Sequence, residues 1–294
     1  MKINIGHLNL YAKEWGDPSS DNKILAVHGW LDNADSFDPL MKQLQDAAKN
    51  DFHLIAIDLP GHGDSSFYPG YVNYTFHHLL VELKACLNAL NWKKYSLMGH
   101  SLGAGALSLM AGIYADELRS LILFDGLGPL TIPDEKYVLS LRKTIDKTLK
   151  FRTLDAEKLY LLRDKRENMI KKRVQANIAG LIPQELIEIL AQRSLKEHQG
   201  LSYWHFDPRL RIDSLTRFSE NQVSLILKAI KAPTILWSYK GTHVVHQHLN
   251  DSIHQRSQFV KNIEIIERQT HHHAHMEKWD DENLEKFYQF LSMD

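Results

Sequence analysis

The residues with the clearest chemical potential lie in one short segment, Gly99-His100-Ser101-Leu102-Gly103. A G-x-S-x-G pattern between an apolar run and an apolar helical stretch is typical of a sharp strand-to-helix turn that projects a nucleophilic serine. Glycines are expected on both sides of the serine because the strand and the helix approach each other closely there. An ordinary turn in a nucleotide-binding fold is the alternative interpretation of this segment.

A serine hydroxyl attacks a carbonyl carbon efficiently only when a base accepts its proton and donors stabilise the developing oxyanion. The backbone N–H of Leu102, at the start of the helix, is one natural donor. The backbone N–H of Trp30 is the second, because it follows His28-Gly29 at the end of an apolar run and Gly29 permits close approach. We therefore predict an oxyanion hole formed by Trp30 and Leu102. In the alternative interpretation, His28-Gly29 is only a turn that ends the strand.

The elements that must position these residues alternate between short apolar runs and amphipathic helices. Apolar runs lie at 24–27, 52–57, 95–98 and 121–124, after two strand-like segments at 2–5 and 8–15. Helices are expected after Thr75, a plausible N-cap, and from Leu102. Uninterrupted apolar strands are typical of a parallel sheet that helices cover on both faces. The order predicts an α/β fold with a mostly parallel central sheet.

The pattern changes after residue 130. From about 135 to 215 the chain is charged, with apolar residues at helical spacing and without an apolar strand. A capping-box pair, Ser219 and Gln222, then precedes a further helix, and strands are expected at 234–237 and 263–267 before a last helix. We predict a core formed by residues 1–130 and 223–294, interrupted by a helical cap insertion at 131–222.

Three motifs resemble the α/β-hydrolase superfamily by their order and spacing. They are Val27-His28-Gly29-Trp30, Asp58-Leu59-Pro60-Gly61-His62-Gly63-Asp64-Ser65 and the segment around Ser101. The longer stretches His28-Gly29-Trp30-Leu31-Asp32-Asn33 and Phe124-Asp125-Gly126-Leu127-Gly128-Pro129 resemble its serine hydrolase-like branch. The resemblance implies the α/β-hydrolase fold with a helical cap, and hydrolysis by a serine, a histidine and an acid.

The same resemblance places the base after the last strand, in a Gly-His-x-x-x-x-Glu pattern. Counting back from Glu277 selects His272, with His271 in place of the glycine, while His271 and His273 remain the alternatives. A metal cluster is a competing interpretation of His271-His272-His273-Ala274-His275. Adjacent histidines cannot all point at one ion, and no carboxylate pair stands nearby at ligand spacing. We therefore expect no metal and no cofactor.

The acid departs from the commonest form of the superfamily, which usually places an Asp shortly after the strand at 234–237. Residues 238–243 contain no carboxylate, and Asp251 is too far along the chain. We predict that Asp125, at the end of the run 121–124, is the acid that orients His272. The alternative is that Asp125 is only a turn residue, which would leave a dyad or an inactive site.

Other polar and aromatic residues have simpler interpretations. Asp32, Asp58 and Asp64 are expected to hold turns through side-chain to backbone hydrogen bonds. The aromatic segment 203–206 is interpreted as packing or as the roof of a pocket. The basic segment 171–173 is expected on a solvated face rather than on an interaction surface.

Composition limits the classes of protein that fit the chain. Its 294 residues include 35 basic and 36 acidic side chains, so the net charge is −1. This balance argues against nucleic acid or a membrane as partners. The single cysteine, Cys86, excludes an internal disulfide and a Cys-based zinc site. Without a signal-like start or an apolar stretch of membrane-spanning length, we expect a cytoplasmic protein.

These observations predict a serine hydrolase of the carboxylesterase type that cleaves a small ester or a related acyl compound through an acyl-enzyme. A serine at position 101 argues against dehalogenase or epoxide-hydrolase chemistry, which uses an aspartate nucleophile in related proteins. Carbon–carbon bond or lactone hydrolysis by the same triad is one alternative. A non-catalytic ligand-binding protein that keeps the pocket is another. The sequence indicates neither the natural substrate nor the oligomeric state.

Overall fold

The fold is built on one eight-stranded sheet in a computed structural model that describes residues 1–153, 163–175, 182–240 and 244–292. The strands are β1 (Lys2–Asn4), β2 (Asn9–Gly16), β3 (Lys23–Val27), β4 (His53–Ile57), β5 (Tyr95–His100), β6 (Leu118–Phe124), β9 (Thr234–Tyr239) and β10 (Ile263–Arg268). Their spatial order is β1-β2-β4-β3-β5-β6-β9-β10. The β1–β2 and β2–β4 pairs are antiparallel and the other five pairs of this sheet are parallel, so the predicted mostly parallel α/β sheet is confirmed.

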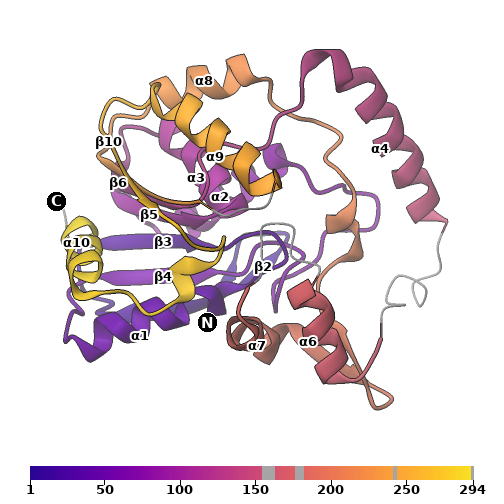
Figure 1. The fold of residues 1–294 in the computed structure, drawn as a ribbon, viewed down its shortest axis with the longest axis horizontal. Helices are drawn as coiled ribbons and strands as arrows, with labels where there is room; N and C mark the ends of the chain where they lie inside the picture. The colour runs from indigo at the N-terminus through magenta and orange to yellow at the C-terminus, as the bar shows by residue number, and fades with distance from the viewer. Residues whose placement is uncertain (154–162, 176–181, 241–243, 293–294) are drawn as a thin grey trace.

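Helices cover both faces of the sheet (Figure 1). One face carries α1 (Asp38–Asp46) and α10 (Asp281–Leu291), and the other carries α2 (Phe76–Ala89), α3 (Leu102–Ile113), α8 (Glu220–Lys228) and α9 (Val244–Ser257). Alternate residues of β3 supply both cores: Leu25 and Val27 pack under α2 and α3, whereas Ile24 and Ala26 pack under α1. Burial on two faces explains why the central strands are uninterrupted apolar runs.

The expected helix starts are confirmed. The Thr75 hydroxyl accepts the backbone N–H of His78 at 3.2 Å and caps α2. Ser219 and Gln222 form a complete capping box at the start of α8. Both arrangements satisfy N–H groups that have no partner within the helix, which fixes where each helix begins.

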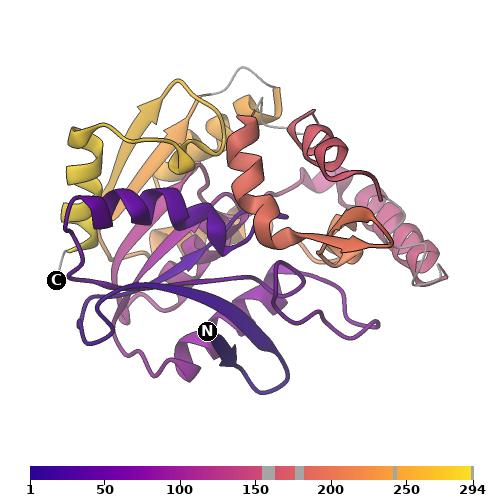
Figure 2. The ribbon, with the colours of Figure 1, turned by 90° about the horizontal axis from the view of Figure 1, so that it is seen from below.

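The segment between β6 and α8 leaves the sheet and lies beside it (Figures 1 and 2). It contains α4 (Tyr137–Arg152), α6 (Arg166–Gln175), α7 (Gln184–Ser194), β7 (Leu195–His198), β8 (Leu201–Trp204) and a short 3-10 helix, η3 (Pro208–Arg211). We call residues 131–222 the cap. No helix among the described residues is long and apolar enough to cross a membrane.

The expectation of a cap without strands was wrong. Strands β7 and β8 form an antiparallel hairpin joined by Gln199 and Gly200, whose φ angles are 51° and 75°. A two-residue loop with positive φ at both positions matches the twist of a hairpin. The sequence concealed the hairpin because Lys196, Glu197 and His198 give β7 no apolar run.

Helix α7 is one of the cap segments that hold the cap on the core. Arg193 donates to Asp35, in the short 3-10 helix η1 (Ala34–Phe37), at 2.8 Å and to Asp58, in the loop after β4, at 2.7 Å. The Asn33 side chain donates to the Leu190 carbonyl at 3.0 Å. Helix α4, in contrast, exposes apolar side chains such as Val138, which is 78% accessible. One part of the cap is therefore fixed to the sheet by buried polar contacts, and the other packs more loosely.

Candidate active site

Ser101 lies between the end of β5 and the first residue of α3, at the carboxyl edge of the sheet. Its φ of 52° and ψ of −111° are sparsely populated by residues other than glycine. The backbone resists relaxation because the Ser101 N–H donates to the Phe124 carbonyl at 2.9 Å and the Ser101 carbonyl accepts from Gly105 at 2.9 Å. The strand, its neighbour and the helix thus hold the serine in a strained turn.

The two flanking glycines are required by close packing. A Cβ on Gly99 would lie 2.7 Å from the Ala104 nitrogen, and one on Gly103 would lie 2.1 Å from the Val27 carbonyl oxygen. Both distances are shorter than non-bonded atoms tolerate. The expectation that small residues allow the strand and helix to approach is confirmed.

His272 connects the serine to a buried carboxylate. Its Nε2 lies 2.7 Å from Ser101 Oγ, and its Nδ1 lies 2.5 Å from Asp125 Oδ2. Asp125 is fully buried, and the His272 side chain is 11% exposed. The carboxylate selects the tautomer with the proton on Nδ1, so Nε2 is left to accept the serine proton. The structure brings together the three side chains that the sequence singled out.

Asp125 is fixed by the strand beside it. Its backbone N–H donates to the Trp237 carbonyl at 2.8 Å, and its Oδ1 accepts the backbone N–H of Tyr239 at 2.9 Å. Strand β9, after which the superfamily usually carries the acid, therefore supplies backbone groups that hold Asp125. Asp251 is exposed on α9, and residues 241–243 lie outside the described ranges.

The histidines on either side of His272 have other partners. His271 Nε2 lies 3.0 Å from a carboxylate oxygen of Glu277. His273 Nε2 lies 3.0 Å from Asp32 Oδ2. Of the three candidates for the base, His272 is the one whose ring contacts Ser101.

Asp32 is the centre of a second buried network. Arg173 of α6 donates to Asp32 Oδ1 at 2.9 Å, and His100 Nδ1 lies 3.5 Å from Oδ2. Burial alone would raise the pKa of Asp32, but His273, the hydrogen bonds and Arg173 hold it well below the ordinary value. Burial lowers the pKa of His273 to about 4, so this ring is neutral and donates its Nε2 proton to Asp32.

Two expectations about aspartates were wrong. Asp32 contacts side chains rather than holding the backbone of its turn, and the carboxylate of Asp64 contacts Arg193 and Lys196. Asp58 does hold its loop, because its oxygens accept the backbone N–H groups of Ala34 at 2.8 Å and of Asp64 at 2.9 Å. Spacing along the chain could not distinguish these aspartates, since cap cations contact all three and their positions depend on how the cap packs on the core.

Arg173 also departs from the sequence-based expectation. Its neighbours Lys171 and Lys172 are exposed as predicted, but the Arg173 side chain is only 18% exposed. It lies 4.8 Å from the Trp204 ring and donates to the Leu31 carbonyl at 2.8 Å. No sequence signal distinguished this inward cation from the two lysines before it, because α6 has few apolar positions to define its buried face.

The Asp32 network is also the place where a metal ion could be considered. Within the described part of the chain, ligand atoms of Asp32, His100 and His273 lie within 4.8 Å of one another. Asp32 already accepts from the Arg173 guanidinium and from His273, and a second cation would be repelled by the first. His100 Nε2 donates to the His272 carbonyl at 2.9 Å. The arrangement fits a hydrogen-bond network that supports the backbone of His272.

The predicted oxyanion donors lie where two elements meet. Leu102 begins α3, and Trp30 follows β3 in the loop that starts at His28. A Cβ on Gly103 would meet the carbonyls of Val27 and His28, so the start of α3 lies directly against the end of β3. The Trp30 indole donates to the Leu210 carbonyl of η3 at 3.0 Å, which ties this loop to the cap.

Ser101 and His272 open into a cavity of about 910 Å³ between the sheet edge and the cap. Trp30 and Leu102 also line it. In the aromatic segment 203–206, Trp204 lines this cavity and also packs with Phe206 in a buried hydrophobic cluster. Both interpretations of that segment therefore apply, and Trp204 combines them.

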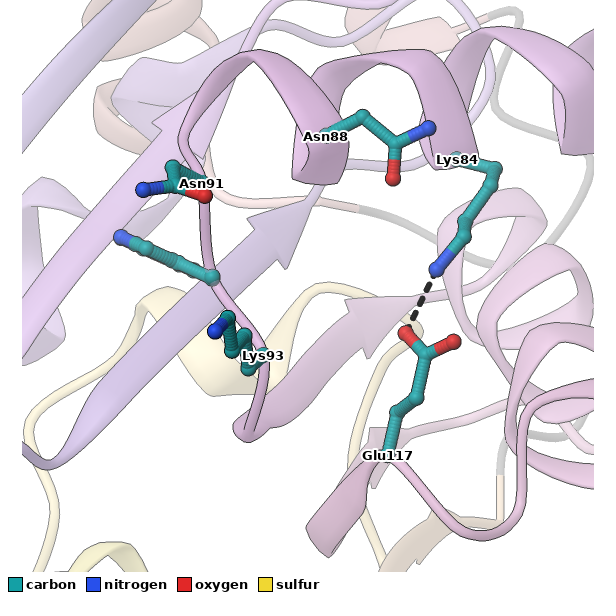
Figure 3. A pocket seen from close by; sticks show the side chains of 6 residues that line it. Lys84, Asn88, Asn91, Lys93 and Glu117 are labelled. Atoms are coloured by element: carbon teal, nitrogen blue, oxygen red, sulfur yellow. Dashed lines mark hydrogen bonds and ion pairs between the residues drawn. The ribbon is translucent and has the colours of Figure 1, made fainter.

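A second hollow, of about 500 Å³, lies near the amino ends of β5 and β6, and Figure 3 shows side chains that line it. It is lined by the end of α2 and by the loops before β5 and β6, and a Lys84–Glu117 ion pair of 2.5 Å crosses it. Parallel strands present ligand sites at their carboxyl ends, and this hollow lies at the amino ends of β5 and β6. The cavity beside Ser101 is the candidate active site.

The fold and the site define the class of the protein. Residues 22–278 match the family of the alpha/beta hydrolase fold, and the chain therefore belongs to that family. Its relatives indicate the serine hydrolase-like branch. A serine hydrolase-like protein of Dictyostelium discoideum is 30% identical over 287 residues, which cover 94% of this chain and 77% of the relative.

Two further comparisons agree. A serine hydrolase-like protein of Danio rerio is 27% identical over 228 residues, which cover 77% of this chain and 67% of that protein. The crystal structure of a hypothetical protein from Pseudomonas aeruginosa PAO1 has a TM-score of 0.83 and 26% identity, and the match covers 99% of this chain and 98% of that one. The chain is similar to these proteins along the core and the cap.

Proposed function

We propose that the protein is a serine esterase that hydrolyses a small ester or related acyl compound through Ser101, His272 and Asp125. The observation that carries the proposal is the continuous hydrogen-bond chain, 2.7 Å from Ser101 Oγ to His272 Nε2 and 2.5 Å from His272 Nδ1 to Asp125 Oδ2. These lengths suit proton transfer in the ground state. The membership of the serine hydrolase-like branch supports the same reaction class.

In the proposed reaction, Ser101 Oγ attacks the carbonyl carbon while His272 Nε2 takes the serine proton. Asp125 stabilises the imidazolium and keeps the ring in place. The amides of Trp30 and Leu102 donate to the oxyanion, and the positive end of α3 favours the same charge. His272 then returns the proton to the leaving alcohol. Water, activated by His272, hydrolyses the ester bond to Ser101 and releases the acid.

Hydrolysis of p-nitrophenyl acetate and butyrate tests the proposal. We expect turnover by the wild type and a loss of kcat of about 1,000-fold or more in Ser101→Ala, because removal of the nucleophile abolishes acyl-enzyme formation. Ser224→Ala, on α8 away from the cavity, is the matched control and should keep the wild-type rate. Hydrolysis that survives Ser101→Ala undiminished would refute the assignment.

A further inference from the structure

The lining of the catalytic cavity is unusually basic for a chain whose net charge is −1. Among the described residues, its cationic side chains are Lys147, Lys172, Arg173, Arg211 and Arg217. The carboxylates among the same lining residues are Asp32 and Asp213. The cavity therefore carries an excess of positive charge that the whole molecule does not have.

Three of these cations are already compensated. Arg173 donates to Asp32 at 2.9 Å, and Arg217 donates to Asp213 at 2.9 Å. Lys172 lies 2.7 Å from Asp164, just outside the cavity. Within the described ranges, Lys147 and Arg211 have no carboxylate partner.

The Lys147 ammonium lies beside the backbone of the second uncompensated cation, Arg211. Lys147 Nζ donates to the backbone carbonyl of Arg211 at 2.6 Å, a contact that leaves its charge unneutralised. The Arg211 guanidinium lies 4.9 Å from the Phe206 ring. Burial, together with the nearby charge of Arg173, lowers the pKa of Arg211. Lys147 and Arg211 are both exposed, so their charges are available to an anion that enters the cavity.

The position of this pair is fixed from two sides. The carbonyls of Leu210 and Arg211, at the end of η3, accept from Trp30 of the core and from Lys147 of α4. Ser101 lies at the sheet edge, whereas α4 and η3 belong to the cap (Figure 1). Apolar side chains, among them Phe76, Leu79, Ile212 and Phe218, form other parts of the lining.

We propose that the cavity binds anionic esters, with the reacting carbonyl at Ser101, an apolar segment along the lining, and a carboxylate or phosphate at Lys147 and Arg211. This inference deepens the proposed esterase function and rests on it. The Lys147–Arg211 pair would determine specificity rather than take part in the bond-breaking step. A neutral ester of the same length would reach Ser101 but leave the two cations without a counter-charge.

A matched pair of substrates tests the inference. Mono-p-nitrophenyl adipate carries a free carboxylate, and methyl p-nitrophenyl adipate is its neutral counterpart with the same leaving group. We expect wild-type kcat/KM to favour the anionic ester by about tenfold, which is the size of one charge-assisted hydrogen bond. Arg211→Gln and Lys147→Gln should each reduce that ratio, and the double variant should bring it close to one. Raising the ionic strength should also reduce it.

Lys143→Gln is the matched control, because Lys143 lies on the same helix one turn before Lys147 and does not line the cavity. It should keep the wild-type ratio. A wild-type ratio near one, or a preference that survives the double variant, would overturn the inference. The hexanoyl ester of 4-hydroxybenzoate and its methyl ester repeat the comparison with the anion on the alcohol side. The pair with the larger ratio identifies which part of the substrate carries the anion.

Binding separates this inference from the proposed function. On the Ser101→Ala variant, calorimetry with monomethyl adipate and dimethyl adipate reports the anion preference without turnover. Tighter binding of the monoester that Arg211→Gln weakens would support the anion site even if no ester were hydrolysed. Equal binding of the two compounds would reject the anion site and leave the esterase proposal intact.

Discussion

Two carboxylate–histidine pairs lie side by side in the candidate site. His272 contacts Asp125 at 2.5 Å, and the next residue, His273, contacts Asp32 at 3.0 Å. The two rings are 5.4 Å apart and nearly perpendicular, so they present their nitrogens in different directions. His272 contacts Ser101, whereas His273 lies in the network that joins the loop after β3 to α6.

The charge around each carboxylate explains the difference. Asp125 accepts a neutral backbone N–H from Tyr239, so its negative charge can stabilise an imidazolium on His272. Asp32 instead contacts the Arg173 guanidinium, which already compensates its charge. The same pair of residue types thus suits proton transfer in one setting and structural anchoring in the other.

Replacing each histidine with glutamine should produce the largest difference in activity between the two pairs. His272→Gln should lower kcat/KM for p-nitrophenyl butyrate by about 10,000-fold, because no other group can accept the serine proton. His273→Gln keeps an N–H that can donate to Asp32 and should lower kcat/KM by less than about tenfold. Steady-state kinetics at pH 8 measures both, with thermal melts to establish that each variant is folded. Equal losses would contradict the division of roles.

Substitution of Asp125 should likewise reduce activity much more than substitution of Asp32. Asp125→Asn should lower kcat by about 10,000-fold, because an amide N–H facing Nδ1 favours the wrong histidine tautomer. Asp32→Asn leaves the chain from Ser101 to Asp125 in place and should cost much less activity. Kinetics of the two variants, measured side by side, checks this order. A larger loss in Asp32→Asn would move the catalytic acid from Asp125 to Asp32.

The ion pair between Asp32 and Arg173 should instead contribute mainly to the free energy of unfolding. Arg173→Met leaves the buried Asp32 carboxylate without its guanidinium and should lower the free energy of unfolding by about 3 kcal/mol. Asp32→Asn combined with Arg173→Met should recover part of this loss, since the uncompensated charge is then gone. Urea unfolding of the single and double variants measures the coupling. Strictly additive losses would show that the two side chains do not act as a pair.

Lowering the pH should reduce the free energy of unfolding through His273, which belongs to the same network. Burial lowers the pKa of His273 to about 4, below its ordinary value, so the unfolded chain binds more protons than the folded one as the pH falls below about 6.5. The stabilisation is therefore present above that pH and is lost between about 6.5 and 4, by about 3 kcal/mol for this group. Unfolding measured from pH 8 to 4.5 should show a shallower decline for His273→Gln. An unchanged slope would contradict the burial of a neutral ring.

We expect His271 to take part neither in proton transfer, as His272 does, nor in the Asp32 network, as His273 does. Its contact with Glu277 is partly exposed, with 33% of the Glu277 side chain accessible. Such a pair contributes at most about 1 kcal/mol, so His271→Gln should change the unfolding free energy by less than that and kcat by less than about twofold. The kinetic and unfolding measurements above apply unchanged. A large kinetic effect would place the base at position 271.

The core of the fold was predictable because each strand and helix carries its own local signal. The buried run before His28, the glycines around Ser101 and the capping box at Ser219 each follow from packing within a few residues. Asp125 could be suggested because residues 238–243 lack a carboxylate. Its contact with His272 depends on the pairing of β6 with β9, which is a long-range property of the sheet.

The cap was less predictable. The β7–β8 hairpin carries charged residues, and only the packing of α6 against the loop after β3 distinguishes Arg173 from its exposed neighbours. The role of Arg193 likewise depends on its ion pairs with Asp35 and Asp58, which lie more than 130 residues earlier in the chain. Contacts of this kind arise from how the cap packs on the core, and no local periodicity records them.

Intact mass after exposure to a fluorophosphonate probe tests the central claim most directly. We predict one adduct on the wild type, none on Ser101→Ala, and much slower labelling of Asp125→Asn, because the probe reports an activated serine rather than a particular substrate. Labelling of Asp125→Asn at the wild-type rate would refute the role of Asp125. Failure of the wild type to label, while a control hydrolase does, would contradict an activated Ser101 and favour a ligand-binding protein.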